Sequence, residues 1–223
     1  SQAKLILESL YNDPNSSIPK SQLYNNLSLS YQKLGEKNKY TSFLLQAIQE
    51  IETNKLSDSN YYTVKLGLFR NLFVYYNSIG DSLNAISYIN RAQNLAEEQE
   101  DINELAAIYL YLGDYYWKNF KDSDKTLQQY EKAEVILKNI DNYRRKISVL
   151  TNKSSLFIKI DSLKEATSSI KEIKNLASRN SDAPSYIEAL IFEGEIASKR
   201  NDLVKFESVM DEIGIYSLDD LEF

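Results

Sequence analysis

The sequence contains neither cysteine nor histidine. Without these residues the chain has no disulfide, no thiolate nucleophile, no Cys/His zinc site and no Ser-His-Asp triad. The glycine spacings of phosphate-binding loops, Gly-x-Gly-x-x-Gly and Gly-x-x-x-x-Gly-Lys, are also absent. We therefore predict that the protein is not an enzyme and has no catalytic residues, no metal and no cofactor.

Long apolar runs are missing as well. No stretch approaches the roughly 20 consecutive apolar residues that a membrane-spanning helix needs. The net charge is −6, and the only compact basic cluster is Arg144-Arg145-Lys146, so the basic stripe of a nucleic-acid-binding protein is missing. With 17 Tyr and 8 Phe the chain nevertheless has enough apolar surface to bury a core. These features predict a folded protein that neither inserts into a membrane nor binds nucleic acid through this region.

An internal repeat is the strongest pattern present. Three triplets share a three-then-four spacing and are separated by 45 and 40 residues: Tyr24, Leu27 and Tyr31; Phe69, Leu72 and Tyr76; Tyr109, Leu112 and Tyr116. This spacing places each triplet on one face of a helix. Two fainter copies follow at Leu150 and Leu190, with Lys153 and Glu193 at the position of the leucine. Helices with a common face, recurring in step, indicate a repeat protein.

Each triplet is followed by a turn and a second helix. Gly35, Gly80 and Asn201 suit the left-handed backbone that ends a helix. In three of the turns Asp81, Ser162 and Asp202 can cap the next helix. The second helices are expected over 37–53, 82–99, 122–139, 162–180 and 202–213. Small residues recur near their ends, where two helices of a hairpin approach closely: Ala47, Ala92 and Ala133. The predicted hairpins span 20–54, 58–99, 101–140, 142–180 and 182–213.

These residues resemble the tetratricopeptide repeat (TPR) family. The family's order of aromatic, Leu, small residue, Tyr, Gly and two alanines is matched best in the first three copies, as in Tyr24, Leu27, Ser28, Tyr31, Gly35 and Ala47. Armadillo-type and HEAT repeats share the period, but this order favours TPR. The resemblance implies an all-α fold, a right-handed superhelical solenoid of antiparallel helix hairpins. Repeats of 40–45 residues resemble those of kinesin light chains and bacterial peptide-responsive regulators.

The domain prediction is one continuous solenoid over 1–223. Residues 1–13 are expected to form a short helix that acts as a partial repeat or cap, because the ends of a solenoid must be covered. Residues 214–223 are expected to be a tail or the start of another helix, with Ser217 as its N-cap.

The resemblance also implies a concave groove lined by the first helix of each hairpin. Its groove positions include Leu110, Ile158 and the candidate site residues Asn26, Arg70, Asn71, Tyr111, Asp114, Trp117 and Asn152. Family members often use asparagine in such a groove to bind a peptide backbone, since an amide both donates and accepts hydrogen bonds. Asparagine is also common at exposed helix positions of this chain, which would leave these residues without a binding role.

The predicted function is a non-catalytic scaffold that binds a protein or an extended peptide, as the sensory or interaction domain of a larger bacterial regulator. The alternative is a structural module that forms homo-oligomers through the ends of the solenoid. The compartment is left open between cytoplasm and periplasm. Because the first residue is Ser1 rather than methionine, the sequence is interpreted as processed or cut from a longer protein, which favours an extracytoplasmic location.

Overall fold

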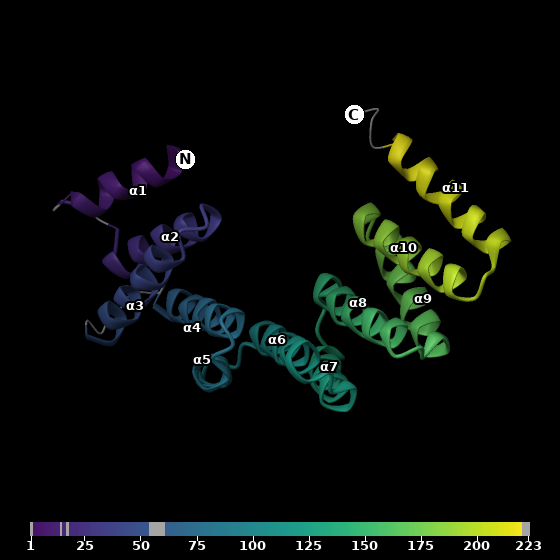
Figure 1. The fold of residues 1–223 in the computed structure, drawn as a ribbon, viewed down its shortest axis with the longest axis horizontal. Helices are drawn as coiled ribbons and strands as arrows, with labels where there is room; N and C mark the ends of the chain where they lie inside the picture. Colours follow the sequence, from purple (N-terminus) through teal and green to yellow (C-terminus); the bar gives the residue numbers. More distant parts are fainter. Residues whose placement is uncertain (1, 14, 17, 54–60, 220–223) are drawn as a thin grey trace. The chain divides into compact units, whose positions relative to one another are not determined.

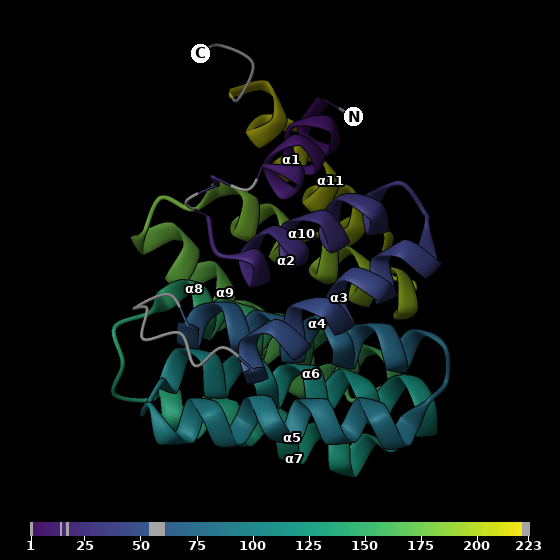
Figure 2. The same cartoon turned by 90° about the vertical axis from the view of Figure 1, so that its left-hand side faces the viewer.

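The structure is a computed structural model that describes residues 2–13, 15, 16, 18–53 and 61–219. This part of the chain is α-helical and contains no β-strand. Its helices are α1 (Gln2–Asn12), α2 (Lys20–Lys33), α3 (Lys37–Thr53), α4 (Tyr61–Ser78), α5 (Ser82–Glu98), α6 (Ile102–Phe120), α7 (Ser123–Leu137), α8 (Tyr143–Lys159), α9 (Leu163–Arg179), α10 (Ala183–Lys199) and α11 (Leu203–Asp219). Successive helices pack as hairpins (Figures 1 and 2), which confirms the predicted all-α fold class.

The helices form two compact units, an N-terminal unit (Ser1–Asp101) and a C-terminal unit (Ile102–Phe223). The hairpins of the N-terminal unit are α2–α3 and α4–α5, with α1 packed on α2. Those of the C-terminal unit are α6–α7, α8–α9 and α10–α11. Within each unit the first helices of neighbouring hairpins touch, α2 with α4 in one and α6 with α8 and α8 with α10 in the other. That the hairpins form one continuous domain stays a prediction.

Left-handed residues end the first helix of several hairpins. Gly35 and Gly80 have φ of 74° and 80°, as expected for glycine at this position. Asn201 also has positive φ, whereas in the fourth copy Asp161 takes this conformation. The next helix is then capped by a carboxylate in three of the hairpins, where Asp81, Asp122 or Asp202 accepts a hydrogen bond from the backbone N–H three residues later. Ser162 occupies the cap position of α9, but its side chain makes no capping bond.

Alanines lie where the paired helices cross. Ala47, Ala92 and Ala133 are each fully buried, as predicted. The family's first alanine lies seven residues before the second, and in two hairpins a larger residue, Tyr40 or Thr126, takes its place. The hydroxyl of each donates a hydrogen bond to a backbone carbonyl of the first helix of a hairpin. The Tyr40 hydroxyl donates to the Asn71 carbonyl at 3.1 Å, and the Thr126 hydroxyl donates to the Gly113 carbonyl at 3.3 Å. The small position can therefore be filled by a larger side chain when its polar atom finds a backbone acceptor.

The C-terminal helix is longer than predicted. α11 continues through Gly214 to Asp219, so a separate helix capped by Ser217 is wrong. One glycine inside a helix costs only about 1 kcal/mol relative to alanine and does not end it. Residues 220–223 of the predicted tail lie outside the described part of the chain, as do residues 58–60 of the predicted second hairpin. None of the described helices combines the length and apolarity needed to cross a bilayer.

Candidate functional site

A hollow in the C-terminal unit joins residues of two neighbouring hairpins. It has a volume of about 150 Å³ and lies among α6, α7 and α8. We call it the α6–α8 hollow; its lining residues are Asp114, Trp117, Tyr130, Asn152, Ser155, Leu156 and Lys159. Three of the predicted site residues, Asp114, Trp117 and Asn152, therefore line the same space.

Asp114 is held in this hollow by Tyr130. The Tyr130 hydroxyl donates to the Asp114 carboxylate at 2.5 Å. The Tyr130 ring lies directly over Gly113, where an added Cβ would be 2.3 Å from the ring atom Cε1. Because Gly113 has no side chain, the Tyr130 ring of α7 can pack directly on the backbone of α6.

The electrostatics of this pair follow from its surroundings. Loss of water around the carboxylate raises the pKa of Asp114, against the opposing effects of the Tyr130 hydrogen bond and the Lys159 ammonium. Burial, and then the bond to Asp114, raises the pKa of Tyr130, so the hydroxyl stays protonated and remains a donor. Tyr130 uses one oxygen of Asp114, and a carboxylate has acceptor capacity left for a ligand.

Trp117 lies between the hollow and the core. Its indole is half-buried and packs against a buried cluster that contains Leu110, Tyr130 and Leu156. The Lys121 ammonium lies 5.2 Å from the centre of the indole ring. These contacts hold the ring in place while part of it faces the hollow.

Asn152 borders two spaces at once. Besides the α6–α8 hollow it lines a more open polar space between α8 and α10, of about 400 Å³, which we call the α8–α10 hollow. That space is lined by Arg144, Ile147, Ser148, Thr151, Asn152, Asp182, Ser185 and Glu188. The Asn152 side chain makes no hydrogen bond to any described residue, so its donor and acceptor are both available.

The other candidate residues are placed differently. Tyr111 is half-buried on α6 and lines neither hollow. In the N-terminal unit, Asn26 lies on α2, and Arg70 and Asn71 lie on α4, which packs against α2. The Asn71 amide donates to the Asn25 side chain at 3.1 Å, so part of its capacity is used within the protein.

Two predicted groove positions belong to the core instead. Leu110 and Ile158 are 8% and 1% exposed and lie in buried clusters, so their assignment to the groove is wrong. Their apolar side chains turn inward because burial removes them from water. Ser155 is a further groove position implied by the resemblance, and it lines the hollow. Tyr130, Leu156 and Lys159 also line the hollow but were not predicted. Of these three, Lys159 could have been found from the sequence, because it lies one helical turn after Ser155.

Similarity to known proteins is found at the level of the fold and not of the sequence. The chain matches no known family model and no curated protein sequence. Among solved structures it is similar to BtubC (BKLC) from P. vanneervenii, with a TM-score of 0.75 and 17% identity over 100% of this chain and 89% of that one. It is also similar to a putative kinesin light chain from Podospora anserina with nearly identical TPR-like repeats, with a TM-score of 0.67 and 12% identity over 92% and 99% of the two chains. The fold is TPR-like.

A second crystal structure of the Podospora anserina protein gives a TM-score of 0.68. At 12–17% identity these likenesses concern the fold alone. These structural neighbours thus confirm the TPR-like fold that the sequence resemblance implied.

Proposed function

We propose that the protein is a non-catalytic scaffold that binds an extended polypeptide segment along α6, α8 and α10 of its C-terminal unit. The observation that carries this proposal is the meeting of Asp114, Trp117 and Asn152 around one hollow, although they come from two hairpins. The Asn152 amide supports it further, because within the described residues it is unbonded and borders the adjoining hollow as well.

Each side chain has a distinct part in this proposal. Asn152 pairs with a backbone N–H and C=O of the bound segment, which requires no particular side chain there. Asp114, oriented by Tyr130, accepts a hydrogen bond from a donor group of the segment. Trp117 offers a fixed aromatic surface for an apolar or cationic side chain. Asn26, Arg70, Asn71 and Tyr111 are proposed as further contacts, the first three within the N-terminal unit.

The test is selection of binding peptides from a displayed library of random linear peptides, followed by calorimetry. An unsatisfied hydrogen-bonding group costs about 1–3 kcal/mol, so Asn152→Ala should weaken a selected peptide roughly five- to a hundred-fold. Asn175→Ala is the matched control, because Asn175 is exposed on α9 and lines neither hollow. Equal affinities for the wild type and both variants would place the binding surface elsewhere.

The proposal extends to a cellular role, the sensory or interaction domain of a larger bacterial regulator. Its support is the resemblance of the long repeats to those of bacterial peptide-responsive regulators. The full-length gene product decides this part: an adjoining DNA-binding or kinase segment is expected, and a protein without any such segment contradicts it.

A second function, self-association, is favoured by one observation on α11. Leu203 and Val204 are 73% and 80% exposed, and apolar surface of this kind is stabilised by burial against a second copy. If α11 is the interface, analytical ultracentrifugation should show a dimer that Leu203→Lys with Val204→Lys dissociates. A wild-type protein that is monomeric at all concentrations rules out this alternative and leaves the scaffold proposal intact.

A further inference from the structure

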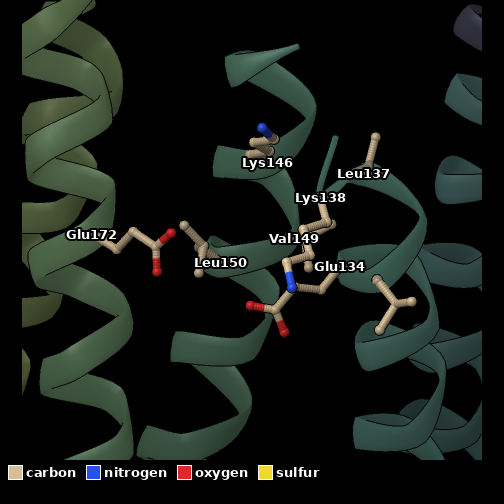
Figure 3. A pocket seen from close by; sticks show the side chains of 8 residues that line it. Glu134, Leu137, Lys138, Lys146, Val149, Leu150 and Glu172 are labelled. Carbon is tan, nitrogen blue, oxygen red and sulfur yellow. The ribbon is translucent and has the colours of Figure 1, made fainter. Parts of the chain in front are cut away.

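Another pocket in the C-terminal unit lies away from the two hollows of the candidate site. It has a volume of about 380 Å³ and lies among α7, α8 and α9 (Figure 3). We call it the α7–α9 pocket; it is lined by Glu134, Val135, Leu137, Lys138, Lys146, Val149, Leu150 and Glu172. A volume of a few hundred Å³ is typical of sites that enclose a small group or a side chain.

The pocket and the polar residues of the two hollows lie on different sides of α8. Residues 146, 149, 150 and 153 form one stripe of this helix, since successive residues are rotated by about 100°. Ser148, Asn152, Ser155 and Lys159 form a stripe roughly half a turn away, and these residues line the hollows. The α7–α9 pocket is therefore a separate surface that the proposed peptide site does not use.

The floor of the pocket is apolar. Leu137, Val149 and Leu150 are buried and provide a hydrocarbon base. Val135 at the edge is 70% exposed, so apolar surface continues from the floor to solvent. An apolar group that entered here would gain burial against four aliphatic side chains.

The rim is charged and carries both signs: Lys138 and Glu134 on the α7 side, Lys146 on α8 and Glu172 on α9. Lys138, after the end of α7, and Lys146, near the start of α8, form no ion pair with any described residue. Glu172 reaches toward the pocket from α9 (Figure 3) and is likewise without an ion pair in the described part of the chain. Glu134 differs, because its carboxylate is bound by Lys153 at 2.6 Å.

The position of Lys146 is not explained by helix stability. The first turns of α8 contain Arg144, Arg145 and Lys146 and no acidic residue. Cations at a helix N-terminus oppose the helix dipole, each by a few tenths of a kcal/mol to about 1 kcal/mol. An anionic group beside Lys146 and Lys138 would remove this mismatch.

From the apolar floor and this charge pattern we infer that the α7–α9 pocket binds a partner polypeptide through one apolar side chain flanked by an acidic and a basic residue. The apolar side chain fills the floor formed by Leu137, Val149 and Leu150. The acidic residue pairs with Lys138 and Lys146, and the basic residue pairs with Glu172. The pocket thus selects a partner by a sequence of charges rather than by backbone hydrogen bonds.

The experiment uses a displayed peptide library with a fixed central leucine and randomised flanking positions, selected on the whole chain carrying Asn152→Ala. The Asn152→Ala background reduces selection through the hollows, so that failure here is distinguishable from failure of the proposed peptide site. Selected peptides should carry an acidic residue on one side of the leucine and a basic residue on the other.

Reversing the charges on the rim of the pocket tests whether they determine which peptides bind. On Lys138→Glu with Lys146→Glu, the peptides selected on the native pocket should bind about tenfold or more weakly, and a new selection should enrich basic residues in place of the acidic ones. Glu172→Lys should change only the residues selected on the basic side of the leucine. All three side chains are on the rim, so circular dichroism should show an unchanged helical fold. Val135→Ser, at the exposed edge, should weaken binding a few-fold without affecting charge selection.

Three outcomes overturn the inference. The first is enrichment of the same peptides on the native and the charge-reversed pocket. The second is selection of peptides in which replacing the leucine by serine has no effect. The third is a library that yields no binder on the native pocket.

Discussion

The two units fill the leucine position of the repeat with different chemistry. In the N-terminal unit this position holds Leu27 and Leu72, both fully buried. In the C-terminal unit Leu112 is also buried, but the next two copies carry Lys153 and Glu193. Lys153 pairs with Glu134 at 2.6 Å, and Glu193 pairs with Lys174 at 3.3 Å. In each case the partner lies 19 residues earlier, on the second helix of the preceding hairpin.

This difference shows what the position requires. Both an apolar and a charged side chain can occupy it, the charged ones paired with a residue of opposite charge on the preceding helix. An ion pair fills the space only because both partners are present, since a buried charge without a partner is strongly unfavourable. The fourth and fifth repeats keep the hairpin packing although their sequences match the repeat least.

Aromatic packing marks the same contrast. In the N-terminal unit stacked rings join the two helices of each hairpin, Tyr31 with Phe43 at 5.4 Å and Tyr76 with Tyr88 at 5.6 Å between ring centres. In the C-terminal unit α9 contributes alanine and isoleucine to its core, among them Ala166 and Ile170, both fully buried. Rings therefore make the early repeats recognisable in the sequence, whereas aliphatic packing leaves the later ones faint.

The largest loss of stability is expected when the charged residue found at the leucine position of the C-terminal unit is placed in the N-terminal unit. Leu72→Lys places a charge at a fully buried position of α4 and should destabilise the N-terminal unit by about 3–5 kcal/mol. Urea unfolding followed by circular dichroism measures the change, with Leu72→Met as a control expected to cost less than about 1.5 kcal/mol. A cost below about 1 kcal/mol for the lysine would show that the N-terminal unit also tolerates charge at this position.

A smaller effect is expected from glycine replacements, with opposite signs in the two units. Gly113→Ala would force the buried Tyr130 ring away and should cost about 1–3 kcal/mol. Gly67→Ala on α4 meets no atom within 4 Å and should stabilise by about 0.4–1 kcal/mol, because alanine restricts the unfolded chain. Thermal and urea unfolding of the two variants would measure both signs. Equal stabilisation by both would mean that the Tyr130 ring does not depend on Gly113.

The smallest effect is expected where the ion pair is replaced by apolar packing. Lys153→Leu combined with Glu134→Gln should change the stability of the C-terminal unit by no more than about 1 kcal/mol, because a partly exposed ion pair contributes little. High salt weakens this ion pair, so the wild type should lose slightly more stability at high salt than the double variant does. A loss of several kcal/mol in the double variant would make the ion pair a requirement of the fold.

The sequence predicted the helices well because each has an apolar face with the helical period. It was wrong about the end of the last helix, since α11 continues through Gly214 to Asp219 and neighbouring residues can carry a helix across one glycine. It also did not foresee Asp161 in the left-handed conformation. Tight turns between packed helices impose that backbone on residues that rarely adopt it alone.

The candidate site was only partly predictable. The resemblance to tetratricopeptide repeats pointed to Asp114, Trp117 and Asn152 as groove positions, and these side chains line the α6–α8 hollow. It did not separate them from Leu110 and Ile158, because a groove position and a core position differ by only a small rotation about the helix axis. Tyr130 was missed because its approach to Asp114 depends on the space above Gly113, which is a property of the packed hairpin.

The most direct test of the proposed peptide site uses the fluorescence of Trp117, the only tryptophan in the chain. A peptide selected on the wild type is titrated into the protein while indole emission is recorded, and Trp117→Phe provides the blank. If the segment binds in the α6–α8 hollow, the emission changes and saturates with the Kd measured by calorimetry, and Asn152→Ala raises that Kd. A peptide that binds by calorimetry while the emission of Trp117 stays constant would contradict the proposed site.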